Sequence, residues 1–587
     1  MKQLLLTLLL LLSPCLSRAV CHVITPAGSG TKSGADWNNA CADFTVNCAP
    51  TSYVRGDTYY MAAGGYAAFD MPPIAGTALI TIKGATSADH CTNTGYTNST
   101  MSVEIGQADL TPSCNTSACL WVTGSHYVLD GNTGTLNGHH GIVFTRDLPG
   151  NGTGWIRFGN GGSLTLTDIT LQHIEFNNVN AFNLPDTTCA NAIFYISQDT
   201  VSNFAIKFGY FHDAKGDFAT FANPPISNFT YSNNWEQTDR STGSCHSEGF
   251  AFWGGTNITF SYNTFVDIAG SAVIFNLENQ ATNLYVYGNL WYSPAGSSQS
   301  VGTGFVSDNI TVPDGPIVNA FIFNNTIANV PNSTNAGITM RSAASSNWDV
   351  KNNLWYNTGP ISQNAPHDFN TFLNVGTQTF NLGANEFLTA SGSASPFVST
   401  TDYRLTSETV DPHLNDGTNT NALLAANGTD VNGITRGADG TWERGTFEFQ
   451  ISGPGVLFSP ASLSFGNQTV NTTSANQETT LTNSGTTALT ITSISLSGAD
   501  TGDFALPTSS SPCPISPSTL AASATCTIRV TFMPLTTGAR SASVSVVDNA
   551  AGSPHTVPLT GTGTGAGGGN KGCQIVGSAI LVKGTCQ

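Results

Sequence analysis

The sequence predicts an all-β protein in which a parallel β-helix is followed by a separate β-sandwich. Three observations predict this. Only 10% of the residues are charged and Gly reaches 61 of 587, a composition typical of turn-rich β proteins. A short strand pattern that ends in Asn recurs along the middle of the chain. After residue 452 this repeat stops, and short strands follow one another at regular spacing.

The repeat consists of a β-prone run, an Asn and an apolar pair, as in "YGNLWYS" and "FNNTIAN". Its Asn residues lie 26 to 36 positions apart, at Asn234, Asn263, Asn289, Asn325 and Asn353. A period of this length is typical of a solenoid, in which each coil stacks on the next. We therefore expect these five side chains to point inward at one corner and to form hydrogen bonds along the stack.

The residues between these Asn positions predict three short strands per coil. In "ITFSYN", Ile258 and Phe260 share one face while the residues between them are polar, which indicates a strand. A second strand recurs in four segments that align without gaps: "GFAFWG" (249–254), "AVIFNL" (272–277), "GFVSDN" (304–309) and "GITMRS" (337–342). A third strand follows each Asn. Residues 20–452 are therefore expected to form stacked coils spaced by about 4.8 Å.

Motifs at the two ends of this region resemble a known family. "CHVITPAGSGTKSGADWNNA" with "VRGDTYYMAAGGY", and "TDVNGITRGADGTWERGTFEF" further on, are similar to the entry and closing segments of right-handed parallel β-helix proteins. That family includes pectate lyases and many secreted polysaccharide-active proteins, and the resemblance covers residues 22–450. It implies a right-handed coil. It also implies that a glycan lies across the outward face of the strand after the long third-turn loops.

The C-terminal part has a different pattern. Residues 453–563 contain strands at short, regular spacing with turn residues between them, as expected for a β-sandwich. They resemble the immunoglobulin-like modules of the abnormal-spindle and choice-of-anchor type. Cys513 and Cys526 are close in sequence and are expected to pair within this module. Residues 564–587 are expected to form a Gly-rich linker and a disulfide-closed tail.

The N-terminus and the cysteines predict an extracellular protein. Lys2, an apolar run and a small-x-small site ending at Ala19 are typical of a secretory signal peptide at residues 1–19. Pro14 and Arg18 disfavour a lipoprotein anchor as the alternative. Of the 13 Cys residues, one belongs to the signal peptide, and the even number that remains shows no C-x-x-C spacing. Disulfides are therefore expected rather than a zinc site.

Charge narrows the class of partner. The net charge of −18 argues against nucleic acid and against anionic membranes. No segment after the signal peptide is long enough to span a membrane. The partner that the family resemblance implies is a polysaccharide or a cell-surface glycan.

The gapless alignment of the second strand predicts one outward column of side chains. If Phe250 and Phe252 face the core, the column consists of Trp253, Asn276, Asp308 and Arg341. An aromatic ring stacks on sugars and polar groups bind hydroxyls, so we expect a shallow glycan groove about 14 Å long over three rung steps.

Two loops are expected to wall this groove. They span residues 236–248 and 293–302 and are the longest local insertions of the repeat. The first contains His246 and Glu248, which we predict as further substrate-binding residues.

Asp308, Arg341 and Glu278 are the predicted catalytic residues. A lyase requires a base, for which Arg341, Lys207 or Lys351 are available, and a cation or Arg that neutralises a uronate carboxylate. A hydrolase requires two carboxyl groups, and the Cα atoms of Glu278 and Asp308 are expected about 8 Å apart. We favour the lyase slightly. The same two carboxylates would suit Ca²⁺, and no other metal or cofactor is indicated.

Less specific interpretations stay open at this point. Asp308 and Arg341 lie on adjacent rungs and would also fit a surface ion pair. Fold alone does not decide function. The alternative to an enzyme is a non-catalytic surface or glycan-binding protein, with the β-helix as a rigid scaffold and the sandwich as an interaction module.

Overall fold

The computed structural model of the protein describes residues 20–565 with internal gaps. The gaps are 45–47, 49–51, 111–118, 135–137, 139, 147–155, 160–163, 179–193, 197–198, 213–218, 222–225, 238–248, 277–278, 299–300, 309–314, 390–393, 407–427, 435, 437–441, 449–452, 484, 486, 508–512, 514–517 and 522–523. The predicted signal peptide and residues 566–587, which include the predicted disulfide-closed tail, lie outside the described residues. The chain divides into two compact units, Met1–Phe449 and Gln450–Gln587.

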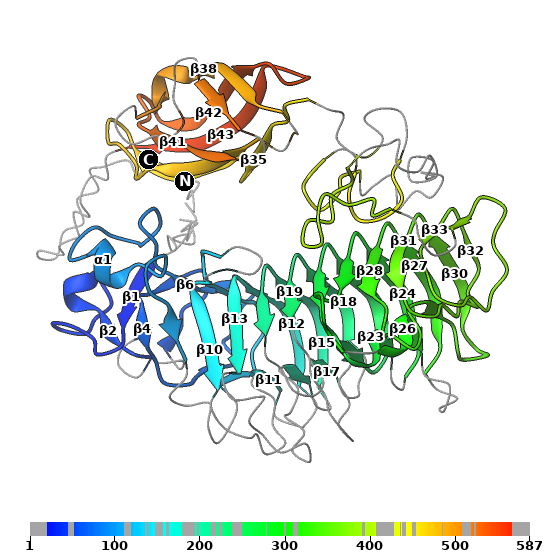
Figure 1. The fold of residues 1–587 in the computed structure, drawn as a ribbon. Coiled ribbons are helices and arrows are strands. Elements are labelled where there is room, and N and C mark those ends of the chain that lie inside the picture. Colours follow the sequence, from blue (N-terminus) through cyan, green and yellow to red (C-terminus); the bar gives the residue numbers. More distant parts are fainter. Residues whose placement is uncertain are drawn as a thin grey trace, which may run out of the picture. The chain divides into compact units, whose positions relative to one another are not determined.

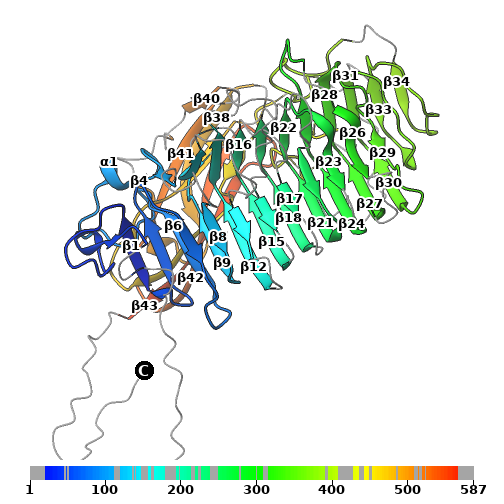
Figure 2. The same cartoon turned by 90° about the horizontal axis from the view of Figure 1, so that it is seen from below.

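The first unit is a parallel β-helix with three sheets of 13, 12 and 9 strands (Figure 1). Successive coils place their strands side by side in parallel, so the predicted all-β class is confirmed. Figure 2 shows the first sheet as a row of strands from β1 to β30. In order its strands are β2 (Cys41–Ala42), β1 (Cys21–Thr25), β3 (Thr58–Met61), β6 (Ile80–Gly84), β9 (Tyr127–Asp130), β12 (Thr165–Gln172), β15 (Thr200–Lys207), β18 (Ile226–Ser232), β21 (Gly255–Ser261), β24 (Ala281–Tyr287), β27 (Ile317–Phe323), β30 (Ser346–Lys351) and β32 (His367–Asp368).

The second and third sheets follow in each coil. The second sheet consists of β34 (Phe387–Thr389), β33 (Thr371–Leu373), β31 (Leu354–Thr358), β28 (Thr326–Val330), β25 (Leu290–Tyr292), β22 (Thr264–Val266), β19 (Trp235–Gln237), β16 (Tyr210–His212), β13 (Ile174–Asn178), β10 (Ile142–Arg146), β7 (Ala108–Asp109) and β4 (Gly64–Gly65). The third consists of β29 (Ile338–Thr339), β26 (Val301–Asp308), β23 (Gly270–Asn276), β20 (Phe250–Phe252), β17 (Ala219–Phe221), β14 (Phe194–Ile196), β11 (Ile156–Phe158), β8 (Leu120–Val122) and β5 (Phe69–Met71).

Apolar side chains fill the interior of the coils. In β21 and β24, Ile258, Phe260, Leu284 and Val286 are at most 1% exposed, while the residues between them face outward. Stacking of identical registers therefore builds one continuous core along the β-helix. This core is the main stabilising element of the unit, because burial of apolar surface contributes roughly 25 cal/mol per Å².

The predicted Asn ladder is confirmed. The Oδ1 atom of Asn263 accepts hydrogen bonds from the backbone N–H of Asn234 at 3.0 Å and from its Nδ2 at 3.1 Å. The same pair of bonds links each successive member through Asn289, Asn325 and Asn353. The ladder continues to Asn370, which the sequence pattern did not single out. All six side chains are buried, so we call this row the inner ladder.

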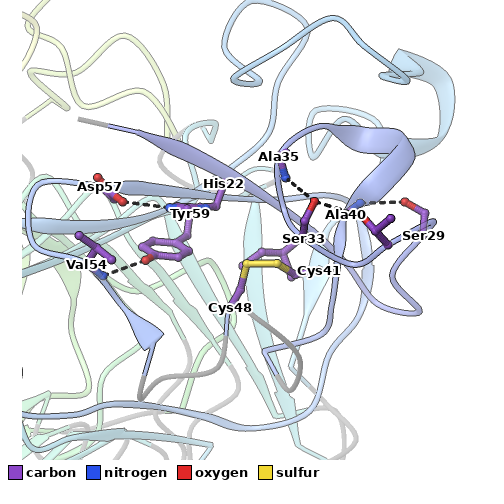
Figure 3. The surroundings of a disulfide bond; sticks show 12 residues. His22, Ser29, Ser33, Ala35, Ala40, Cys41, Cys48, Val54, Asp57 and Tyr59 are labelled. Atoms are coloured by element: carbon purple, nitrogen blue, oxygen red, sulfur yellow. Dashed lines mark hydrogen bonds and ion pairs between the residues drawn. A yellow bond between two sulfur atoms is a disulfide. The ribbon is translucent and has the colours of Figure 1, made fainter. Parts of the chain in front are cut away.

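Disulfides fasten the N-terminal end of the β-helix. Cys21 pairs with Cys91 and Cys41 with Cys48. Figure 3 shows the second bond beside strand β3, whose Tyr59 hydroxyl accepts a hydrogen bond from the Val54 N–H at 2.9 Å. The short elements η1 (Trp37–Asn39) and α1 (Asn98–Met101) belong to the same end of the unit.

A segment that we call the return segment, residues 428–448, packs back onto the coils through its described residues, 428–434, 436 and 442–448. The Thr446 N–H donates to Thr326 Oγ1 at 2.8 Å, and the Arg444 guanidinium donates to the Asn370 carbonyl at 2.7 Å. Arg436 and Glu448 form a buried ion pair at 3.1 Å within the segment. These contacts cover part of the outer surface of the later coils.

The second unit is a β-sandwich of two sheets. One consists of β35 (Leu457–Ser459), β37 (Gln477–Thr482), β41 (Thr525–Phe532) and β39 (Phe504–Ala505). The other consists of β36 (Leu463–Thr469), β43 (His555–Thr564), β42 (Gly538–Asp548), β38 (Leu489–Ser497) and β40 (Ser518–Leu520). All pairings are antiparallel except that of β36 with β43. The predicted Cys513–Cys526 disulfide is confirmed, beside a separate apolar core.

Candidate functional site

The third sheet shifts the predicted outward column by one residue. Phe252, and not Trp253, pairs with Asn276, which pairs in turn with Asp308. Successive residues of a strand face opposite sides, so a slip of one residue exchanges the inward and outward faces. Asn276 and Asp308 therefore share the inward register of Phe252, and both are 0% exposed. The prediction that these two side chains face outward is wrong.

Asn276 fastens a corner of the coil. Its Oδ1 accepts a hydrogen bond from the Gly254 N–H at 2.8 Å. Its Nδ2 donates to the carbonyl oxygens of Asn279 at 2.9 Å and Gly315 at 3.0 Å. A buried amide satisfied in this way holds backbone groups that have no other partner in a strand ladder.

Asp308 performs the same task with a carboxylate. It accepts hydrogen bonds from the backbone N–H groups of Arg341 and Ser342 and from the Ser345 hydroxyl. Burial raises the pKa of Asp308, although these hydrogen bonds act in the opposite direction. Within the described residues the Arg341 guanidinium forms no ion pair with this carboxylate. The contact that joins the two residues uses the Arg341 backbone.

The other predicted site residues are only partly accounted for. Trp253 and Arg341 are half-buried at the ends of the predicted column. Glu278, His246 and Glu248 lie outside the described residues, so their predicted roles stay predictions. Among residues that the structure does describe, no three His, Cys, Asp or Glu side chains are placed to share a metal ion.

The outward column of the third sheet begins with Asp70, Trp121 and Arg157. These residues pair directly on the rungs of β5, β8 and β11. Their strand neighbours, such as Leu120 and Phe158, are 0% exposed and face the core. The Cζ of Arg157 lies 5.0 Å from the centroid of the Trp121 ring, a cation–π contact. A carboxylate, an indole and a guanidinium therefore stand in one line on the outside of the sheet.

Their exposure differs along the line. Asp70 is exposed, and partial burial still raises the pKa of its carboxyl group. Trp121 and Arg157 are half-buried. Further along the same column Ala251, Phe275 and Ser307 are buried, at 4% exposure or less. Asp70, Trp121 and Arg157 thus form the exposed or half-buried N-terminal end of the column, and Thr339 at the opposite end is half-buried as well.

The sequence carries one pattern that marks this outward column. "FDM", "LWV" and "IRF" each place one polar or amphipathic residue between two apolar ones. These strands are only three residues long, and no Asn follows them to mark the register. Stretches this short do not distinguish a strand from a loop by periodicity.

A second group of ionisable side chains lies on the outer face of the second sheet. Glu175 forms an ion pair with His212 at 3.2 Å and accepts a hydrogen bond from Gln107 at 2.8 Å. Burial raises the pKa of Glu175, but the His212 and Gln107 contacts outweigh it and lower the pKa below its usual value. Tyr210 stacks on His212 with ring centroids 4.3 Å apart. The pair places a carboxylate and an imidazole in direct contact on the outer face of this sheet.

Comparison with known proteins concerns mainly the second unit. Residues 454–562 match the family model described as HYDIN/CFA65/VesB-like, Ig-like domain, so the predicted immunoglobulin-like module is confirmed. No curated protein matches the sequence.

Matches among solved structures are partial. The ASH/PapD-like domain of human CEP192 is 19% identical and has a TM-score of 0.15, covering 20% of this chain and 92% of its own length. The VesB protease of Vibrio cholerae is 19% identical with a TM-score of 0.15, over 18% of this chain and 31% of its own. The secreted serine protease VesC is 11% identical with a TM-score of 0.16, over 19% of this chain and 23% of its own. The chain thus spans under a third of either protease, and scores this low carry no argument about activity.

No helix in the described part of the chain is both long and apolar enough to cross a bilayer. Three disulfides join described cysteines, at Cys21–Cys91, Cys41–Cys48 and Cys513–Cys526. Such bonds are compatible with an extracellular protein.

Proposed function

We propose that the protein is a secreted polysaccharide-binding protein, similar in kind to the pectate-lyase-like β-helix proteins, that holds a glycan across the outer face of its third sheet. The observation that carries the proposal is the line of Asp70, Trp121 and Arg157 on adjacent rungs. An indole offers a flat apolar surface to the C–H face of a sugar ring. The carboxylate and the guanidinium beside it suit hydroxyl and carboxylate groups of the same chain.

Cleavage of the glycan is a separate question. Asp308 is occupied by three hydrogen bonds in the corner of a coil, so it offers no free acid or base for elimination or hydrolysis. On the described outer column of the third sheet, Asp70 is the carboxylate and Arg157 the cation. A pair of hydrolytic carboxyl groups is not assembled there. Binding is therefore the activity that we propose.

The test is a binding assay with a panel of soluble neutral and uronate-containing polysaccharides, by affinity electrophoresis and calorimetry. Trp121→Ala is expected to weaken binding at least tenfold, since buried aromatic anchors dominate most interfaces. Arg157→Lys keeps the charge but loses the planar stack and is expected to weaken binding as well. Trp235→Ala is the matched control, because Trp235 is a half-buried outer residue of the second sheet.

Each outcome is decisive. Normal binding by Trp121→Ala, or equal loss in Trp235→Ala, would remove the third-sheet site. The same incubations are analysed for new reducing ends and for unsaturated uronates. Products that appear with wild type and vanish with Trp121→Ala would show that the bound glycan is also cleaved.

A further inference from the structure

The outer face of the first sheet carries four aromatic side chains on two adjacent rungs, β24 and β27. Tyr285 pairs with Phe321 and Tyr287 with Phe323 in the sheet register. Both pairs are stacked, with ring centroids 5.5 Å apart at 10° and 5.1 Å apart at 4°. We call these four residues the aromatic platform.

Packing of the β-helix does not require the whole platform. On the preceding coils the column that contains Tyr285 holds Thr170, Ala205, Thr230 and Thr259. Coils with small residues at this outward position form the same strands, because the inward residues alone fill the core. Aromatic rings at this outward position expose apolar surface to water, which is a cost unless something covers it.

The return segment covers part of the platform. Trp442, 8% exposed, packs with Phe323, and both Tyr287 and Phe321 pack against this cluster. Tyr287 also meets Tyr262 edge-on at 5.4 Å. The Tyr285–Phe321 pair stands on the other column, where Tyr285 is half-buried and its hydroxyl has no hydrogen bond among the described residues. Tyr285 and Phe321 are both half-buried, so each side chain keeps a solvent-exposed part.

A row of outward-facing amides runs beside the platform; Asn283 and Asn319 in it are half-buried and the other four are exposed. We call it the outer ladder; its members are Asn203, Asn228, Asn257, Asn283, Asn319 and Asn347. Each has a left-handed backbone with φ between 50° and 61°, and each Nδ2 after the first donates to the Oδ1 of the Asn before it. Asn283 lies two residues before Tyr285, about 6.6 Å along the strand.

These amides retain hydrogen-bonding capacity. Asn283 donates one bond to Asn257 at 2.9 Å and accepts one from Asn319 at 2.9 Å. An amide has two N–H groups and two acceptor lone pairs, so one of each is left over at Asn283. Neither β24 nor β27 contains a charged residue, and the neighbouring Asp349 and Lys351 neutralise each other at 2.9 Å.

From this arrangement we infer a second binding surface, for an uncharged polysaccharide that lies along the β-helix axis on the first sheet. Sugar rings stack on Tyr285 and Phe321, and their hydroxyl groups bind the spare N–H and oxygen positions of Asn283 and Asn319. The absence of charge on these two strands excludes the strong ion pairs that an anionic glycan requires. The surface is independent of the third-sheet site, because its residues belong to a different sheet.

The experiment is a pull-down on insoluble uncharged polysaccharides: microcrystalline cellulose, chitin and β-1,3-glucan particles. The full-length protein is expected to be retained on at least one of them. The double variant Tyr285→Ala with Phe321→Ala is expected to lose at least tenfold in apparent affinity. Phe321→Leu keeps apolar volume next to Trp442 but lacks a flat ring, and a similar loss is expected from it.

Two controls separate the surfaces. Thr170→Ala with Thr230→Ala changes the same column on coils without aromatic residues and should bind as wild type. Trp121→Ala should also be retained on the particles, whereas the double variant should keep any soluble binding that depends on Trp121. Failure of the third-sheet proposal is thus distinguishable from failure of this one.

Three results would overturn the inference. They are no retention of wild type on any of the three particles, equal retention of wild type and Phe321→Leu, or loss in the threonine control. Light scattering measures the oligomeric state and so tests whether a second copy of the chain, and not a glycan, covers the platform. If wild type is a dimer and the correctly folded double variant a monomer, the platform is a contact between two copies and the inference fails.

Discussion

The inner corner between the first and second sheets and the strands of the third sheet show how differently two parts of one repeat encode their register. In the coils that carry the inner ladder, two residues separate the strands at the inner corner, as in Ser232 to Trp235 and Ser261 to Thr264. The second of the two is the buried Asn, so the marker keeps a fixed distance from both strands. Third-sheet strands have no such marker.

The third sheet also lacks a polarity signal. Ala251, Phe275 and Ser307 face away from the inward residues, yet they are as buried as those residues. When both faces of a strand are buried, the alternation of apolar and polar residues disappears. A gapless alignment then has nothing to correct a slip of one residue. The comparison teaches that a buried marker residue fixes register, whereas hydrophobicity alone does not.

Among the substitutions considered, Asn325→Ala at the inner corner is expected to destabilise the protein most. Its Oδ1 accepts two bonds from Asn289, and its Nδ2 donates to the Val286 carbonyl at 2.9 Å. Loss of the amide leaves buried donors and acceptors unpaired, each at about 1–3 kcal/mol. We expect the β-helix to lose about 3–5 kcal/mol of unfolding free energy in chemical denaturation. A loss below 1 kcal/mol would mean that the ladder is not structural.

Asp308→Ala tests by its effect on stability whether the Asp308 side chain faces the core of the third sheet. An outward Asp308 would leave the melting temperature unchanged when it is removed. The buried carboxylate instead satisfies the N–H groups of Arg341 and Ser342 and the Ser345 hydroxyl. We expect about 2–4 kcal/mol of destabilisation by denaturant titration, and a smaller loss for Asp308→Asn, which keeps one acceptor oxygen. An unchanged midpoint in both variants would restore the outward placement.

These particulars show what the sequence was able to predict. The coil, the inner ladder and the sandwich follow from periodic features: a recurring Asn, period-two alternation and regular turns. The site did not, because it depends on one residue of register in the third sheet. Glu236 illustrates the same limit. The sequence predicts that it begins the loop 236–248 beside the groove, but it occupies an inward position of β19 between Phe211 and Phe265.

Glu236 gives a third prediction, on pH. Its side chain is 2% exposed, and its Oε2 accepts from the Tyr231 hydroxyl at 3.3 Å. Burial raises the pKa of Glu236 well above 4.5, although the Tyr231 hydrogen bond lowers it. The native state therefore holds a proton that the unfolded chain releases above pH 4.5. Stability is full below that pH and falls as pH rises towards the native pKa, by up to about 1.4 kcal/mol per pH unit.

The variant for this prediction is Glu236→Gln, which resembles the protonated acid in shape. We expect wild type and variant to have similar unfolding free energies at pH 4. At pH 8 the variant should be the more stable of the two. Denaturant titrations at both pH values measure the difference, and parallel pH profiles would show that Glu236 ionises without cost in the native state.

The smallest effect is expected in the second row of Asn residues, which faces outward instead of into the core. The Asn283 side chain in the outer ladder forms two hydrogen bonds, to the side chains of Asn257 and Asn319. Asn289 and Asn325 in the inner ladder are joined by the same kind of bond. Asn283 is half-buried and faces outward, so water can reach these partners when its amide is removed and satisfy their hydrogen bonds. Its left-handed backbone, at φ 59°, favours Asn or Gly over Ala, and Asn283→Gly avoids that steric penalty. We expect Asn283→Gly to change the unfolding free energy by no more than about 0.5–1 kcal/mol, against several for Asn325→Ala. Denaturant titrations of both variants give the ratio of the two losses in unfolding free energy.

Equal losses would mean that the hydrogen-bonded row itself stabilises the coils in both ladders. A much larger loss for Asn325→Ala would assign the stabilisation to burial and leave the outer ladder free to bind a ligand.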